Sequence, residues 1–136
     1  MRVRRKARIL AMSILYSMEI QKTTDVAVGR LSLNFYKQPF KKNIIDLALK
    51  FVRGVIKNKD FIDDKISKQA KNWSFNRIAV VDKQIMRVTI FEVFYDPFTP
   101  PPVAINEAVD IAKMYSTHDS GHFVNGILDK ICKKKK

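Results

Sequence analysis

The stretch RRKARILAMSILYSME, residues 4–19, decides the fold class of this 136-residue chain. Its apolar side chains recur at the i, i+3, i+4 and i+7 spacing of one buried helical face. These side chains are Ala7, Leu10, Ala11, Ile14, Leu15 and Met18. Helical spacing recurs over residues 24–36, 40–57, 60–70, 78–95, 103–115 and 124–131. Because no alternating strand pattern or internal repeat competes, we predict one all-α domain over residues 1–136.

Capping residues and prolines set the predicted helix boundaries. Asp25 or Thr24 is expected to cap the second helix, and Asp119 or Ser120 to cap the last. The segment 97–102 contains four prolines and predicts a stiff connector, since proline lacks the amide donor that a helix needs. The helix of residues 40–57 carries apolar side chains on most of its faces, so we expect other helices to surround it.

Positive charge dominates the chain and is concentrated at its start. Lysine and arginine number 26 against 13 acidic residues, which gives a formal net charge of +13 and favours a polyanionic partner. The basic arm, residues 1–8, carries Arg2, Arg4, Arg5, Lys6 and Arg8. We interpret the Lys-rich tail, residues 133–136, as a solubilising segment with nonspecific attraction for nucleic acid.

The sequence favours a cytoplasmic protein without a membrane partner. Its single cysteine, Cys132, cannot form an intramolecular disulfide, and no hydrophobic targeting segment follows the first basic residues. The longest aliphatic run, residues 78–81, is far shorter than the roughly 20 residues that cross a bilayer.

The side of the first helix opposite its apolar stripe carries the functional prediction. Helical geometry places Arg5, Ile9, Met12, Ser13 and Tyr16 there. Arginine and lysine neutralise phosphates, while a tyrosine ring stacks on an unpaired base for about 1–3 kcal/mol. Because stacking needs bases outside a duplex, this face favours single-stranded RNA over duplex RNA. In the alternative interpretation, Ile9, Met12 and Tyr16 pack against another helix.

No residue pattern predicts catalysis, a metal site or a cofactor. His118 and His122 are four residues apart, but zinc needs more ligands than these, so we interpret them as surface or capping residues. Asp63 and Asp64 are adjacent and point in different directions on a helix, which is typical of a solvated face. The four glycines form no phosphate-binding loop. Glu107 is interpreted as stabilising a helix start, with a partner arginine as the alternative.

Segments found in order along nearly the whole chain resemble the NusB family of bacterial transcription antitermination factors. In the first helix the matching residues are Arg4, Arg5, Lys6, Ala7, Arg8, Ala11, Leu15 and Tyr16. In the middle of the chain they are Gly54, Val55, Trp73, Arg77, Asp82, Ile85, Arg87 and Glu92. The most specific segments are VAINEAV at residues 103–109 and FVNGILDK at residues 123–130.

The resemblance implies a NusB-like fold of about seven helices in two small helical bundles, with the first three helices in one bundle. It implies a protein that uses no cofactor and catalyses no reaction. Such a protein binds single-stranded boxA RNA in ribosomal RNA operon leaders together with the ribosomal protein NusE, within an RNA polymerase antitermination complex. The implied RNA contacts are Arg2, Arg4, Arg5, Lys6, Arg8, Tyr16, Asp119 and Phe123. Asp82 and Arg87 are the implied partner contacts.

Two positions depart from the family pattern. Gly121-His122 stands where a basic residue commonly precedes the phenylalanine, so one phosphate contact is expected to be weaker or to depend on histidine protonation. Ser116 stands where a helix-ending glycine is frequent. Both departures concern local geometry and RNA affinity around residues 116–122.

Two other functions are alternatives at this point. One is a free-standing relative of the NusB-like domain of ribosomal RNA cytosine methyltransferases, although no methyl-donor-binding glycine-rich strand follows in the sequence. The other is a membrane-surface protein that uses the basic first helix, although that helix has a core-facing stripe of its own. The sequence leaves open whether the chain is a monomer or a dimer and which RNA sequence it prefers.

Overall fold

The computed structural model describes residues 2–31, 33, 39–71, 74–96 and 98–132. Its elements are α1 (Val3–Ile20), α2 (Val26–Arg30), α3 (Lys42–Lys57), α4 (Lys59–Gln69), the 3-10 turn η2 (Phe75–Arg77), α5 (Val80–Tyr95), α6 (Pro101–Tyr115) and α7 (His118–Cys132). No strand occurs among these residues, so the predicted all-α class is confirmed. Residues 34–36 of the predicted second helix, Trp73 and the Lys-rich tail lie outside the described residues.

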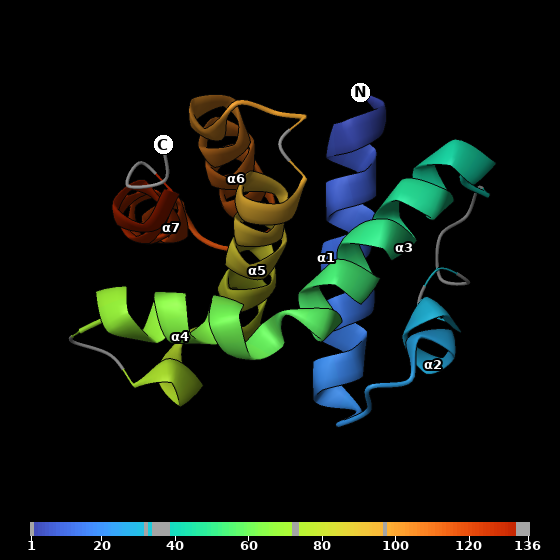
Figure 1. Ribbon diagram of the computed structural model, residues 1–136, viewed down its shortest axis with the longest axis horizontal. Coiled ribbons are helices and arrows are strands. Elements are labelled where there is room, and N and C mark those ends of the chain that lie inside the picture. The colour runs from blue at the N-terminus through green and yellow to red at the C-terminus, as the bar shows by residue number, and fades with distance from the viewer. Residues whose placement is uncertain (1, 32, 34–38, 72–73, 97, 133–136) are drawn as a thin grey trace.

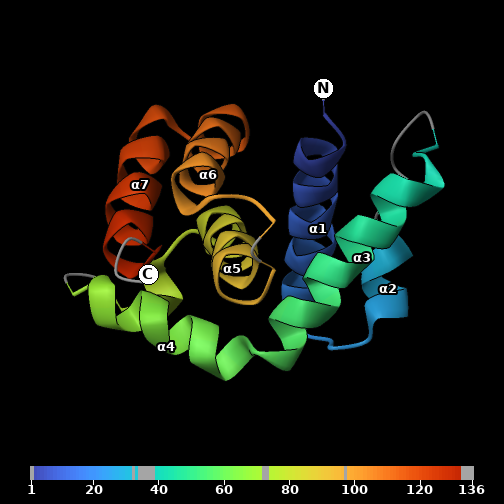
Figure 2. The same ribbon diagram turned by 45° about the horizontal axis from the view of Figure 1, so that its top comes forward.

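The helices form two groups that meet where α1 packs against α5 (Figure 1). Helices α1, α2 and α3 make up the first group, and α5, α6 and α7 make up the second. Helix α4 leaves the end of α3 and packs against α5 and α7 (Figure 2). The two-bundle arrangement that the resemblance implied is therefore confirmed.

The central helix is α5, which is buried without interruption from Asp82 to Val93. Helix α3 instead exposes Lys50, Arg53 and Lys57. The expectation that other helices surround residues 40–57 is therefore wrong. These basic residues occupy one side of α3 and keep that side in water.

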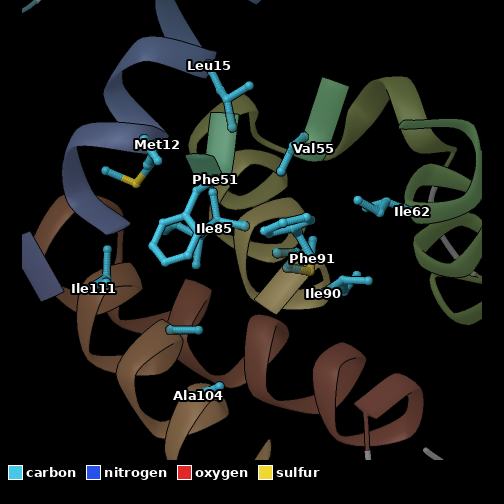
Figure 3. Close-up of a cluster of buried hydrophobic side chains, with 14 of the residues drawn as sticks. Met12, Leu15, Phe51, Val55, Ile62, Ile85, Ile90, Phe91, Ala104 and Ile111 are labelled. Atoms are coloured by element: carbon cyan, nitrogen blue, oxygen red, sulfur yellow. The ribbon is translucent and has the colours of Figure 1, made fainter. Parts of the chain in front are cut away.

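One hydrophobic core joins the two groups and draws buried side chains from α1, α3, α4, α5, α6 and α7, part of which Figure 3 shows. Within it the rings of Phe51 and Phe91 meet edge to face, with centroids 6.2 Å apart. Helix α3 approaches α5 closely at Gly54, where a Cβ atom would overlap the Phe91 ring. A glycine at this position is thus required by the packing of α3 on α5.

Two helix starts illustrate how local chemistry sets the boundaries. The carboxylate of Asp25 accepts a hydrogen bond of 2.9 Å from the Ala27 N–H, so the predicted cap of α2 is confirmed. Pro101 and Pro102 form the first turn of α6 and not the end of a connector. First-turn amides have no acceptor within the helix, so proline costs nothing there. No helix in the described part of the chain is both long and apolar enough to cross a membrane.

Candidate RNA interface

The basic arm leads into α1, and Arg8 ties that helix to the second group. Arg8 is only 6% exposed. Its Nε and Nη2 atoms donate to Glu92 at 2.6 and 2.9 Å, and its Nη1 atom donates to Glu107 at 3.1 Å. Glu92 is fully buried in α5. Removing either partner would leave the other buried charge with only its second partner, which is Arg4 for Glu92 and Glu107 for Arg8, so this ion pair is part of the fold.

Arg4 and Arg5 are also bound to carboxylates. Arg4 donates to Glu92 and to Asp96, in both cases at 3.1 Å. Arg5 donates to both carboxylate oxygens of Glu107 on α6. Their side chains keep 22% and 24% of their surface exposed. A phosphate that approached them would compete with these carboxylates, and their RNA contacts stay a prediction.

Glu107 holds α1 against α6. The hydrogen bond from Arg5 is the main reason that the pKa of Glu107 lies below its ordinary value, and burial opposes it. Glu107 does not lie in the first turn of α6. The interpretation of Glu107 as a helix-start residue is therefore wrong, and the alternative of a partner arginine is confirmed.

The two remaining cations of the basic arm have a different environment. Arg2 is exposed and Lys6 is half-buried. Among the described residues, neither forms an ion pair with a carboxylate. A phosphate at Arg2 or Lys6 would therefore not have to break a protein ion pair, and their RNA contacts stay a prediction.

The outer side of α1 is only partly exposed. Tyr16 is 41% exposed, so its expected exposure is confirmed. Ile9 and Met12 are buried, and for these two the alternative interpretation of packing against another helix is correct. Met12 lies against α5 and α6 beside Ile85 and Ile111. Tyr16 is thus the ring on this side that remains accessible to a base.

The start of α7 supplies two more of the residues implied as RNA contacts. Asp119 is exposed in the first turn, and Phe123 is half-buried against the core. The cap of this helix is Thr117 and not Asp119 or Ser120, because the Ser120 N–H donates to Thr117 Oγ1 at 3.1 Å. Because Thr117 caps α7, the carboxylate of Asp119 is not needed as the helix cap.

His118 and His122 lie one turn apart on α7 and are both exposed. Their rings meet at a right angle with centroids 5.2 Å apart. Within the described residues, no group of three or more histidine, cysteine or acidic side chains could hold a metal ion. The pair therefore adds imidazole edges to the surface beside Phe123.

Asp82, an implied partner contact, lies under the connection between α6 and α7. It is 5% exposed, and its Oδ1 atom has no hydrogen-bond partner in the described part of the chain. Burial raises the pKa of Asp82, while hydrogen bonds from Ser120 and Ser116 oppose that rise. The carboxylate is therefore in a position to orient this connection, whereas direct contact with a partner stays a prediction.

Arg87, the other implied partner contact, is buried at the junction of α1, α4 and α5. Its Nε atom donates to Asp63 at 2.8 Å and its Nη1 atom to Glu19 at 2.6 Å. Lys83 also pairs with Glu19, at 2.7 Å. The interpretation of Asp63 as a solvated residue is wrong because of this pairing, whereas Asp64 is exposed as expected.

Glu19 is strongly stabilised as a carboxylate by this junction. Burial alone would raise its pKa, but hydrogen bonds from Lys83, Arg87 and Gln84 outweigh burial and lower the pKa to about 2. The junction fixes the far end of α1, just as the arginine pairs fix its beginning. Helical spacing in the sequence does not predict these contacts, although an acidic residue such as Glu92 within an apolar helix is a signal of a buried pair.

These features were compared with known proteins. The model of the NusB family matches residues 5–133. The chain belongs to the NusB family. The transcription antitermination protein NusB of Methylacidiphilum infernorum is 40% identical over 131 residues, which cover 96% of this chain and 90% of that protein. The corresponding protein of Chloroherpeton thalassium is 44% identical over 93% of this chain, and the match spans 59% of its greater length.

Solved structures of NusB proteins share the fold. The NusB structure from T. maritima is 36% identical with a TM-score of 0.83, and the match covers 96% of this chain and 91% of that one. A structure of the antitermination factors NusB and NusE in complex with double-stranded RNA is 25% identical with a TM-score of 0.84 and covers 98% of both chains. The resemblance seen in the sequence is confirmed, and with it a role in transcription antitermination that involves no catalysis.

Proposed function

We propose that this protein binds single-stranded boxA-like RNA in ribosomal RNA operon leaders and thereby supports antitermination. The observation that carries the proposal is the exposed ring of Tyr16 on the helix that Arg2 caps and that contains Lys6, two cations without an ion pair among the described residues. Ten residues of helix separate Lys6 from Tyr16, or about 15 Å. A short single strand spans that distance, with phosphates on the cations and a base stacked on the ring.

Asp119 and Phe123 extend this surface at the start of α7. An exposed carboxylate accepts hydrogen bonds from base amino groups, and a half-buried ring offers one edge for stacking. Arg4, Arg5 and Arg8 contribute by holding α1 against α5 and α6, with any phosphate contact secondary to their ion pairs.

The protein acts with the ribosomal protein NusE within an RNA polymerase antitermination complex in the cytoplasm. The similarity to a solved complex of NusB with NusE supports this partner. Since Asp82 and Arg87 are buried, they shape the partner surface from below it. The matched relatives are antitermination proteins, which gives no support to the methyltransferase-domain alternative.

The RNA in that solved complex is double-stranded, so the strandedness of the ligand needs a direct test. Fluorescence anisotropy would compare a labelled boxA-like single strand, a scrambled single strand and the boxA-like duplex, each with and without NusE. We expect the boxA-like single strand to bind most tightly and NusE to increase that preference. Equal binding of the scrambled strand, or tighter binding of the duplex, would overturn the proposal.

A further inference from the structure

A second group of exposed aromatic side chains lies at the carboxyl end of α5, outside the surface proposed above. Phe61 of α4, Tyr95 of α5 and Phe98 of the α5–α6 connector are 39%, 44% and 74% exposed. We call these three residues the aromatic patch. Helix α4 borders the end of α5 where Phe61 meets Tyr95, and α3 borders it where Lys50 pairs with Asp96.

Contacts with neighbouring rings orient two members of the patch. The Phe61 and Tyr95 rings meet edge to face, with centroids 5.9 Å apart. Tyr95 stacks on the buried ring of Phe91 at 5.8 Å with an angle of 19°. Rings held in this way lose little conformational freedom when a flat ligand covers them.

Cations border the patch on several sides. The Nζ atom of Lys65 lies 5.2 Å from the centroid of Phe61, and the guanidinium of Arg4 lies 4.6 Å from that of Phe98. Lys57 is exposed at the end of α3, one turn before Phe61 in the sequence. A cation therefore lies beside each of the Phe61 and Phe98 rings.

The acidic groups nearby do not cancel this charge. Asp96 is shared by Arg4 at 3.1 Å and Lys50 at 3.6 Å and keeps only 12% of its side chain exposed. Asp60 is exposed in the first turn of α4. Lys57 and Lys65 remain without an ion pair among the described residues, so the surface is net positive.

We propose that the aromatic patch is a second binding surface, tolerant of sequence, for single-stranded RNA. Every base has a face that stacks on an aromatic ring, and Lys57 and Lys65 neutralise the phosphates between bases. A duplex hides its base faces, and an acidic peptide has no bases that could stack on the exposed rings. The combination of exposed rings with neighbouring cations therefore favours a single strand over these other polyanions.

The patch is continuous with the basic arm. Arg4 belongs to the arm in sequence and packs on the Phe98 ring, so the two surfaces share a border. An RNA strand that runs from Tyr16 along the basic arm would reach the patch at Phe98. The patch thus lengthens the RNA footprint beyond the boxA-like element, and it does not depend on recognition of that element.

The test uses the full chain carrying Tyr16→Ala, so that binding at the first surface is weakened beforehand. A 12-nucleotide oligouridylate is titrated and followed by amide NMR shifts and by anisotropy. We expect shifts at Tyr95 and Phe98, and a 5- to 100-fold weaker affinity when Phe98→Ala is added, as the loss of one stacked base predicts. Lys57→Gln is expected to weaken binding and to lower the dependence on salt by about 0.7 in log–log slope.

Matched controls lie elsewhere on the surface. Leu31→Ala removes a side chain that is 59% exposed, and Lys42→Gln removes a charge from the other end of α3. Neither should change the affinity. The proposal is overturned if Phe98→Ala binds oligouridylate as well as its parent, or if a duplex or a polyglutamate peptide binds the patch more tightly. Because Tyr16 is already absent, failure of the boxA proposal leaves this result unaffected.

Discussion

The two ends of α1 use their functional side chains in different ways. In its first two turns, Arg4, Arg5 and Arg8 are bound to carboxylates of α5, α6 and the connector after α5. In its fourth turn, Tyr16 stands exposed. The comparison shows that a run of basic residues does not measure the charge available to a ligand. Here three of the five cations of the arm form ion pairs within the protein, and only Arg2 and Lys6 have no such pair among the described residues.

The arginine end is tested most strongly by Arg8→Ala. This change leaves Glu92 charged and buried without its main partner, so we expect the free energy of unfolding to fall by about 3–5 kcal/mol. Urea denaturation followed by circular dichroism measures it. The control is Arg2→Ala, which should change stability by less than about 0.5 kcal/mol. If the two changes lowered stability by similar amounts, the distinction between carboxylate-paired and unpaired cations of the arm would be wrong.

Unlike Arg8→Ala, the change Tyr16→Ala is expected to affect RNA binding and not stability. RNA affinity should fall by about 1–3 kcal/mol through the loss of one stacked base, with little change in stability. Anisotropy and urea denaturation of the same sample separate the two effects. Tyr16→Phe keeps the ring and should retain most of the affinity. If Tyr16→Ala costs several kcal/mol of stability instead, the ring belongs to the core.

In the last turn of α1, the ion pairs of Glu19 can be tested through the dependence of stability on pH. Its pKa is lowered from 4.5 to about 2 in the folded protein, so its contribution is present above about pH 4.5 and is lost as the pH falls toward 2. After allowance for solvent screening, that contribution is about 1 kcal/mol. Glu19→Gln should therefore flatten the acid limb of the stability profile. An unchanged acid limb would show that the junction with Lys83 and Arg87 does not hold this carboxylate.

The ionised carboxylate of Asp82 is expected to lower stability, in contrast to that of Glu19, and its effect is the smallest of those predicted here. Burial raises its pKa, so the ionised carboxylate costs stability at neutral pH. Asp82→Asn removes the charge and should raise the free energy of unfolding by less than about 1 kcal/mol at pH 7. A loss of several kcal/mol would mean that the serine hydrogen bonds require the charge.

Helical periodicity was enough to predict the all-α class and the exposure of Tyr16, while residue type alone left the cap of α2 open between Thr24 and Asp25. It failed for Ile9 and Met12 because the helices that cover them lie far along the chain, and no local spacing reports their presence. The pairing of Arg8 was missed for the same reason, since Glu92 and Glu107 are 84 and 99 residues away. The burial of Asp82 and Arg87 follows from tertiary packing around α5, which a resemblance between residues does not reveal.

The salt dependence of binding to a short boxA-like single strand decides directly how many cations of the arm meet RNA. Five phosphate contacts would give a slope of log affinity against log salt of about −3 to −4, whereas contacts from Arg2 and Lys6 alone give about −1.4. We predict the shallower slope, and a reduction of its magnitude by about 1.4 in the double variant Arg2→Gln, Lys6→Gln. A slope of −3 or steeper that survives this double substitution would show that the paired arginines bind phosphate after all.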